Sequence, residues 1–479
     1  MDFSAYNTWG FFSIFATILI SLLIANALKK LIKPLEASLV PTSVLGGTIL
    51  LIIAVIYKNV TGDILFDTKL FGSNGVVYLE MITYHALALG FISASLKSSK
   101  KKMTKKRGEE VFNTGITTVN TYILQAIVGL AVTIPASFII KDFLAASGII
   151  LAFGYGQGTG QAMNYGSIYE LENGFVGGKA FGLTIAAIGF LCASFGGVIH
   201  LNILKRTGKL KYSDHKTEHI DMDDIQAENE IPMQESVDKL SIQLALITLS
   251  YMIAYGIMFG LSQLLPGMKS TIYGFNFLLG VLTATLVKAT INFLMKKNIV
   301  KKKYTNNFLL TRTSNFFFDI MVVAGIAAIN LDMLERFWGV IAIVCSLGMI
   351  ITYVYNRVVA KTLFKDYSEE QFLAMYGMLT GTASTGIILL REVDIDFKTP
   401  VADNLVYQNF PAIVFGLPIM LLANIAPNNE YLVFGILFAM AIFLNILLFR
   451  RKIFKKFFAS RPLEAGAEES SEINEEAKV

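Results

Sequence analysis

The sequence predicts an all-α polytopic membrane protein built as an inverted-topology repeat. Each half is expected to hold five spans and one re-entrant segment, with one extra C-terminal span. The 479 residues are 54% hydrophobic and only 16% charged, whereas soluble domains carry about 25% charged residues. Basic residues gather beside apolar runs of about 20 residues, the length of a membrane-spanning helix. Two glycine-rich stretches, 154–162 and 377–386, lie at corresponding places in the two halves.

Four apolar runs open the chain, and the excess of basic residues in cytoplasmic loops orients them. They cover residues 9–28, 39–57, 76–96 and 113–140. Basic residues follow the first and third runs, so we expect loops 29–38 and 97–110 inside and loop 58–75 outside. Residues 1–8 hold no basic residue. We therefore interpret the first run as a retained span with its N-terminus outside, not as a cleaved leader.

The segment 145–170 is predicted not to cross the membrane. The span before it ends outside, near Lys141. The span after it, at about 175–204, is followed by Lys205 and Arg206 and so ends inside. A single span that ends inside begins outside, and 145–170 therefore begins and finishes outside. We interpret it as a re-entrant segment that enters from the external face.

A polar linker at 207–238 separates the two halves. It is rich in Asp, Glu and Lys, and it holds His215 and His219, with His200 just before it. A metal site is the weaker interpretation of these histidines, and a solvated cytoplasmic linker is the stronger one.

The second half repeats the count. Its spans cover 240–264, 271–294, 308–330, 337–356 and 403–425, and the extra span covers 430–449. Basic residues place the ends of the fourth span and of the extra span inside. Two full crossings from the inside return to the inside, so 370–391 adds no crossing and enters from the cytoplasmic face. The C-terminus is then cytoplasmic.

The predicted organisation follows from this count. The first repeat is 1–206, the linker is 207–238, the second repeat is 239–425, the extra span lies in 426–456, and 457–479 is an acidic tail predicted to be disordered. Two halves of opposite orientation, each with a broken segment, are typical of secondary transporters.

The glycine-rich stretches are the predicted binding site. Non-helical backbone at membrane depth survives only where protein or water satisfies it. Hydroxyl and amide oxygens suit sodium, and free N–H groups at a helix start suit a carboxylate. We expect the two tips to meet near the midplane; helix packing through small residues is the alternative. The candidate binding residues are Gly156, Gln157, Gly158, Thr159, Gly160, Gln161, Asn164, Thr380, Gly381, Thr382, Ser384 and Thr385.

Two charged residues are further candidates. Asp319 lies within a span, where a carboxylate is costly and marks a functional site. Sodium or proton coupling and pairing with Arg312 both stay open for it, and sodium is expected at Thr159, Asp319 and Thr382. Arg391 follows the second stretch and could grip a substrate carboxylate. A local ion-pair cluster with its acidic neighbours is the alternative for Arg391.

Other classes of function find little support. The two cysteines lie inside apolar spans without metal-ligand spacing. The net charge of +5 is modest and marks topology, so no nucleic-acid partner is expected. The chain has no Gly-x-x-x-x-Gly-Lys-Ser/Thr loop, so nothing indicates ATP use, and we do not expect an enzyme.

Three motifs carry a resemblance that covers most of residues 9–425. They are Gly-x-Gly-Thr-Gly at 156–160, Leu-Thr-Gly-Thr-Ala-Ser-Thr-Gly at 379–386, and the third-span run from Leu87 to Lys97. In these the chain resembles the bacterial sodium/glutamate symporter family. That family has Gly-Gly-His-Gly-Thr-Gly in its first loop, where this chain has Tyr155 and Gln157 in place of the second glycine and the histidine. It usually has glycine where Leu379 stands.

The resemblance implies sodium-coupled uptake of glutamate or a related small organic anion across a bacterial cytoplasmic membrane. It also implies a homodimer, with a rigid oligomerisation part and a mobile part that carries both re-entrant segments. No cofactor is expected beyond the sodium ion. A cation/proton antiporter centred on Asp319 is one alternative. A non-transporting sensor or channel, with the linker as its output, is another.

Overall fold

The computed structural model describes residues 5–97, 104–208, 230–233, 237–266, 269–335, 337–394 and 398–453. Within these ranges the chain is almost wholly helical, and ten helices are long and apolar enough to span a membrane. The all-α polytopic class is therefore confirmed. The predicted acidic tail 457–479, and His215 and His219 of the linker, lie outside the described residues.

The helices follow the predicted order. In the first half they are α1 (Tyr6–Leu31), α2 (Lys33–Ala37), α3 (Thr42–Thr61), α4 (Gly75–Leu96), α5 (Lys105–Ile139), α6 (Ile150–Asn173) and α7 (Gly178–Arg206). In the second half they are α9 (Lys239–Leu264), α10 (Lys269–Gly274), α11 (Asn276–Lys296), α12 (Asn307–Ala327), α13 (Trp338–Leu363), α14 (Ser368–Thr380), α15 (Ala383–Arg391), α16 (Val401–Tyr407) and α17 (Asn409–Ile425). The chain continues through α18 (Glu430–Leu448) and α19 (Arg450–Ile453). Short 3₁₀ turns occur at η1 (Leu65–Asp67), η2 (Lys69–Phe71), η3 (Ala145–Ile149), η5 (Leu331–Leu334) and η6 (Lys365–Tyr367).

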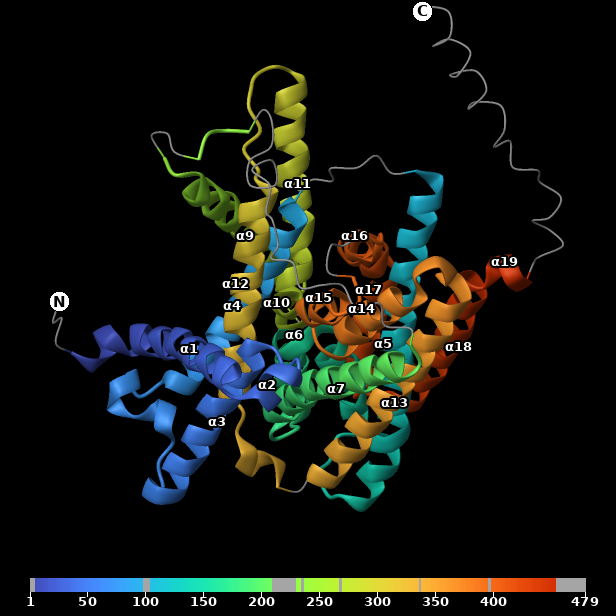
Figure 1. The fold of residues 1–479 in the computed structure, drawn as a ribbon. Helices are drawn as coiled ribbons and strands as arrows, with labels where there is room; N and C mark the ends of the chain where they lie inside the picture. Colours follow the sequence, from blue (N-terminus) through green and yellow to red (C-terminus); the bar gives the residue numbers. More distant parts are fainter. Residues whose placement is uncertain are drawn as a thin grey trace, which may run out of the picture.

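The long helices pack as two bundles (Figure 1). The frame bundle consists of α1, α3, α4, α9, α11 and α12. The hairpin bundle consists of α5, α6, α7, α13, α14, α15, α17 and α18. Each bundle takes helices from both halves, so the two halves are interleaved in space although the linker separates them in sequence.

Helix α12 joins the two bundles. On one side it packs against α3, where a Cβ built on Gly47 would lie only 2.8 Å from Ile326 Cβ. On another side it meets α6, where a Cβ built on Gly325 would lie 2.6 Å from Thr159 Cβ. Glycine at both contacts lets the backbones approach closely, as is common between membrane helices. The glycine-rich stretch of α6 therefore rests directly on the frame bundle.

The predicted span 403–425 is wrong as a single helix. The structure divides it into α16 and α17, with the junction at Gln408. Pro411 lies in the first turn of α17, where a missing N–H costs the helix nothing. A new helix therefore begins here, and α17 has 17 residues, with Pro418 inside it.

The described end of the linker is anchored by a buried ion pair. Glu230 contacts Lys239 at 2.9 Å and Lys303 at 3.5 Å, and it accepts a 2.7 Å hydrogen bond from Asn306. The side chains of Glu230 and Lys239 are 2% and 1% exposed. Burial alone would raise the pKa of Glu230, but hydrogen bonds from Lys239 and Asn306 hold it below its usual value. The linker therefore ends as a charged anchor on the frame bundle.

Candidate binding site

The first glycine-rich stretch folds into a hairpin. Helix α6 is broken at Gly158, whose φ of 79° and ψ of −166° leave the helical region. The rings of Phe153 and Tyr165 stack nearly parallel, with centroids 4.0 Å apart. In a straight helix these residues would be separated by about 18 Å along the axis, so the chain must fold back on itself. At the base, the Phe143 and Phe175 rings lie 5.6 Å apart. The segment therefore starts and ends at the same place.

The second stretch forms a similar hairpin from α14 and α15. The two helices are joined by Gly381 and Thr382, which both leave the helical conformation. A Cβ built on Gly377 would lie 2.9 Å from Gly386 Cα, and one on Gly386 would lie 2.4 Å from the Ala374 carbonyl oxygen. Only glycine permits this approach of the two arms, which accounts for glycine at both positions.

The tips of the two hairpins lie next to each other. A Cβ built on Gly158 would lie 3.4 Å from Thr382 Cγ2, 3.6 Å from Met321 Cε and 3.7 Å from the Phe190 ring. Gly158 and Thr382 are also the positions at which each helix is interrupted. Helix α12, through Met321, and α7, through Phe190, close around this contact. The two stretches thus meet where their backbones are least regular.

The first hairpin brings spare polar atoms close to the tip. Thr159 is fully buried and donates to the Met321 carbonyl at 3.3 Å. Asn164 donates to Gln161 Oε1 at 3.3 Å and to the Gly274 carbonyl at 3.3 Å. Gln157 Oε1 and Gln161 Nε2 are buried and find no hydrogen-bond partner in the described part of the chain. A buried polar atom without a partner calls for an explanation, and a ligand at the tip would supply one.

The remaining predicted residues of this hairpin are glycines that line its arms. The carbonyl of Gly156 accepts a hydrogen bond from Tyr122 of α5 at 3.1 Å. Gly160 lies against Leu87 of α4 and Met321 of α12. These contacts hold the hairpin against α5 of its own bundle and against α4 and α12 of the frame bundle.

The second hairpin contributes hydroxyl groups and a helix start. Thr380 donates to the Tyr376 carbonyl at 2.6 Å, one turn earlier in α14. Thr382 precedes α15 in an extended conformation, and its side chain does not cap that helix. The hydroxyls of Thr382 and Thr385 lie 3.4 Å apart. The first turn of α15 therefore presents its N–H groups beside two hydroxyls. The side chain of Ser384 lies outside the described part of the structure.

The structure does not bring Asp319 to the tips. Its carboxyl group lies near the Ser43 side chain of α3. Asp319, Val323 and Ile326 follow the i, i+4, i+7 spacing of one helix face, the face that packs on α3. The tips instead meet the face of Met321. The suggested partner Arg312 is exposed and lies over the Phe308 ring at 5.2 Å. Asp319 is thus placed inside the frame bundle.

Arg391 also lies apart from the tips. It is the last residue of α15, eight positions after the first, or about 12 Å along the helix. Its side chain is exposed. Its acidic neighbour Asp394 accepts from the backbone N–H groups of Lys398 and Thr399, both at 2.9 Å. This position favours a local polar cluster over contact with a substrate at the tips.

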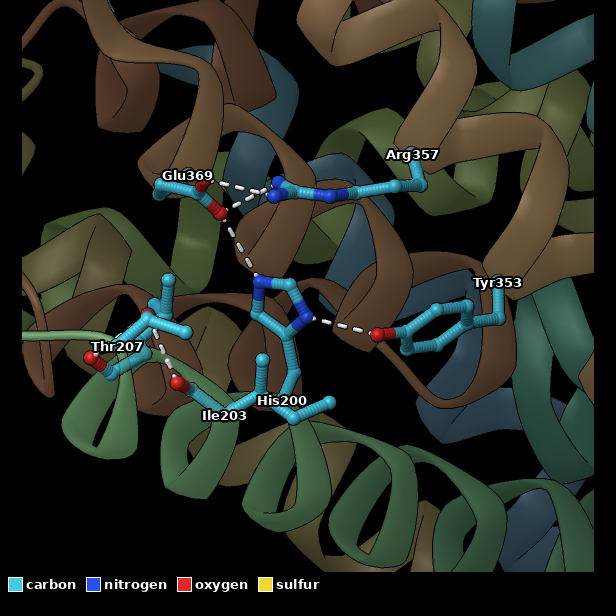
Figure 2. A network of polar contacts seen from close by, with 7 residues as sticks. His200, Ile203, Thr207, Tyr353, Arg357 and Glu369 are labelled. Atoms are coloured by element: carbon cyan, nitrogen blue, oxygen red, sulfur yellow. Dashed lines mark hydrogen bonds and ion pairs between the residues drawn. The ribbon is translucent and has the colours of Figure 1, made fainter. Parts of the chain in front are cut away.

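A network that the sequence analysis missed holds the base of the second hairpin (Figure 2). His200 of α7 pairs through Nδ1 with the Tyr353 hydroxyl at 2.8 Å and through Nε2 with Glu369 at 3.0 Å. Arg357 donates to both oxygens of Glu369, at 2.7 Å to one of them. Burial alone would raise the pKa of Glu369, but its hydrogen bonds with Arg357 and His200 hold it below its usual value. The network ties α14 to α7 and α13.

Comparisons with known proteins do not indicate a function, so the functional assignment depends on the geometry of the site. No protein-family model matches the chain, and a search of curated proteins finds no relative. Chemically, the tips combine unpaired amide atoms, hydroxyls and a helix start. Such a set can bind a small polar ligand that has an anionic group and hydrogen-bonding capacity.

Proposed function

We propose that this protein is a secondary active transporter of the bacterial cytoplasmic membrane. It would take up glutamate or a related small organic anion by alternating access, driven by inward sodium movement. The observation that carries the proposal is the close approach of Gly158 and Thr382, where two broken hairpins meet beside α12 of the frame bundle. Broken segments that meet between repeats are the usual binding sites of secondary transporters. The motif resemblance to sodium/glutamate symporters supports the same class.

The two hairpins are proposed to be re-entrant, the first from outside and the second from the cytoplasm. The adjacent ends of the first hairpin, at Phe143 and Phe175, support a segment that does not cross. The substrate carboxylate is assigned to the first turn of α15, beside Thr382 and Thr385, because helix N-termini attract anions. The amide of Gln161 is assigned to a polar group elsewhere on the substrate.

The division into bundles supports an assignment of moving parts. Both hairpins belong to the hairpin bundle, which we propose to be the mobile part. The frame bundle is proposed to be the rigid part and to form the interface of a homodimer. Asp319 then belongs to the frame bundle, on the side of α12 that faces α3, and it is not proposed as a ligand at the tips.

Uptake into proteoliposomes tests the proposal. We expect purified protein to accumulate labelled glutamate when sodium is high outside, and to lose accumulation when choline replaces sodium. Unlabelled aspartate, malate and glutamine as competitors would define the substrate class. Sodium-independent proton exchange without uptake of any anion would instead favour a cation/proton antiporter. Absence of both fluxes would favour a sensor.

A further inference from the structure

Helices α5 and α13 carry the same short pattern where they cross. In each, a threonine is followed directly by a tyrosine and, four residues after the threonine, by an amide: Thr121 and Gln125 in α5, and Thr352 and Asn356 in α13. Gln125 Nε2 donates to Thr352 Oγ1 at 2.8 Å, and Asn356 Nδ2 donates to Thr121 Oγ1 at 3.3 Å. Each amide thus contacts the threonine of the other helix. The pairing runs in opposite chain directions, so the helices cross antiparallel with a local two-fold relation.

The side-chain hydrogen-bond donors at this crossing all have acceptors. Gln125 makes its second donation to the Leu379 carbonyl at 2.8 Å, and Asn356 makes its second to the Thr352 carbonyl at 2.9 Å. Both threonine hydroxyls donate to backbone carbonyls one turn earlier in their own helices. Gln125 Oε1 and Asn356 Oδ1, in contrast, accept no hydrogen bond in the described part of the chain. The crossing therefore has spare lone pairs and no spare hydrogen.

The surroundings strengthen the negative potential of these oxygens. Gln125 and Thr352 are fully buried, and Asn356 is 1% exposed, so bulk water does not screen them. Leu379 is the second-last residue of α14, and the carbonyls at a helix C-terminus carry partial negative charge. Such half-helix ends coordinate sodium in other transporters. An unpaired buried acceptor needs a partner, and a cation fits a place that offers only acceptors.

We propose that the crossing of Thr121, Gln125, Thr352 and Asn356 binds a monovalent hard cation, with sodium as the ion. The choice of sodium rests on the proposed function. The ligands are neutral oxygens, whereas calcium and magnesium sites use carboxylates to offset dehydration. Among the described residues, no group of three or more Asp, Glu, His or Cys side chains is placed to hold a metal ion. The site is separate from the hairpin tips.

Gln125 connects this ion site to the proposed substrate site. The same amide group that offers Oε1 to the ion holds the Leu379 carbonyl through its nitrogen. Leu379 lies three residues before Thr382, at the end of the α14 arm that leads into the second tip. An ion at the crossing would therefore fix the end of α14 and order the tip before the substrate binds.

Sodium-dependent thermal stability of the purified protein tests the site without any substrate. Chloride salts of sodium, potassium and choline are compared at constant ionic strength. We expect sodium to raise the unfolding temperature more than potassium or choline. Gln125→Leu and Asn356→Leu should each increase the half-saturating sodium concentration at least tenfold. Asn356→Asp should decrease it, because a carboxylate replaces the unpaired amide oxygen.

Gln243→Leu is the matched control. Gln243 is a fully buried amide of α9 whose nitrogen donates to the Tyr304 carbonyl at 2.8 Å and whose oxygen accepts from the Asn306 N–H at 3.0 Å, so its loss should leave the sodium dependence unchanged. Equal stabilisation by sodium and choline, or by sodium and potassium, would overturn the assignment. So would unchanged half-saturation in both leucine variants. This readout needs no transport, so the two proposals can fail separately. If sodium stabilises the wild type but not Asn356→Leu, and the wild type takes up no glutamate, the ion site is retained and the substrate proposal is rejected.

Discussion

The hydroxyl of Tyr155, in the first hairpin, donates a 2.7 Å hydrogen bond to the carbonyl of Cys345 in α13. The second hairpin makes the reverse contact, since the Tyr376 hydroxyl donates to the carbonyl of Cys192 in α7 at 2.8 Å. Each hairpin is thus fastened by a tyrosine to a long helix of the other half. Neither half can complete its packing alone, although a linker divides them in the sequence.

Removing either tyrosine hydroxyl should lower the stability of the protein. Tyr155→Phe and Tyr376→Phe each lose one hydrogen bond to the carbonyl of a residue inside a long helix, at a cost of about 1 kcal/mol each. Thermal unfolding in detergent would show this as a lower unfolding temperature. Tyr255→Phe, at an exposed position of α9, serves as the control. Unchanged unfolding temperatures in both buried variants would show that the tyrosines do not fasten the hairpins.

Gly158→Ala should impair the first hairpin more than its small size suggests. A φ of 79° with a ψ of −166° lies in a region that is essentially restricted to glycine, so a residue with a Cβ costs about 1–3 kcal/mol there. We expect a lower unfolding temperature and slower glutamate uptake. Gly256→Ala is the control, because a Cβ there meets nothing within 4 Å and alanine favours a helix. Wild-type uptake by Gly158→Ala would mean that the broken conformation is not needed.

The threonines at the tips should matter for ligand affinity. Thr159→Ala and Thr382→Ala should each raise the KM for glutamate or sodium roughly threefold to tenfold, the effect of one lost hydrogen bond. Initial uptake rates at varied glutamate and at varied sodium would separate the two ligands. Thr248→Ala, at an exposed position of α9, should behave as wild type. Wild-type kinetics in both tip variants would move the site elsewhere.

The network at Glu369 predicts a specific pH dependence of stability. Because Arg357 and His200 lower the pKa of this carboxyl in the folded protein, its stabilisation is full above the ordinary carboxyl pKa of about 4.3. It is lost as the pH falls through the lower folded value. Unfolding temperatures measured from pH 7 to pH 3 should fall more steeply in wild type than in Glu369→Gln. The exposed Glu392→Gln should follow wild type, and parallel curves for wild type and Glu369→Gln would contradict the prediction.

Cysteine labelling tests the opposed entry of the two hairpins. A cysteine at position 161 should react with a membrane-impermeant maleimide added outside, and one at position 384 with the reagent added inside, in different states of the cycle. Cys192→Ser and Cys345→Ser would remove the native thiols from the background. If both positions label from the same face only, in a locked state, the hairpins do not enter from opposite sides.

The long helices could be predicted because their signal is local. Hydropathy and basic loops suffice for runs such as α1 and α13, where about 20 apolar residues follow one another. The junction at Gln408 was missed because α16 and α17 are both apolar, and hydropathy does not register a turn between them. A proline at position 411 was the available signal, since proline favours the first turn of a new helix.

The site was predictable only in part. The glycine-rich stretches could be recognised because such breaks are rare in apolar sequence. Their tips were expected to meet, and Gly158 lies close to Thr382 in the structure. Asp319 was expected beside them, but the side of α12 that it occupies depends on helix phase and on which neighbour packs there. His200, Arg357 and Glu369 come from three separate elements. Their sequence spacing carries no sign of the contact.

The fold-back of the first hairpin has a consequence for biosynthesis. Thr159 leaves the ribosome 162 residues before Met321, to whose carbonyl it donates. At about 5–20 residues per second, that interval lasts roughly 8–32 s. During this time the broken tip has neither the second hairpin nor α12 to cover its free peptide groups. The nascent chain must therefore shelter this segment in the insertion machinery or at the membrane surface until the second half arrives.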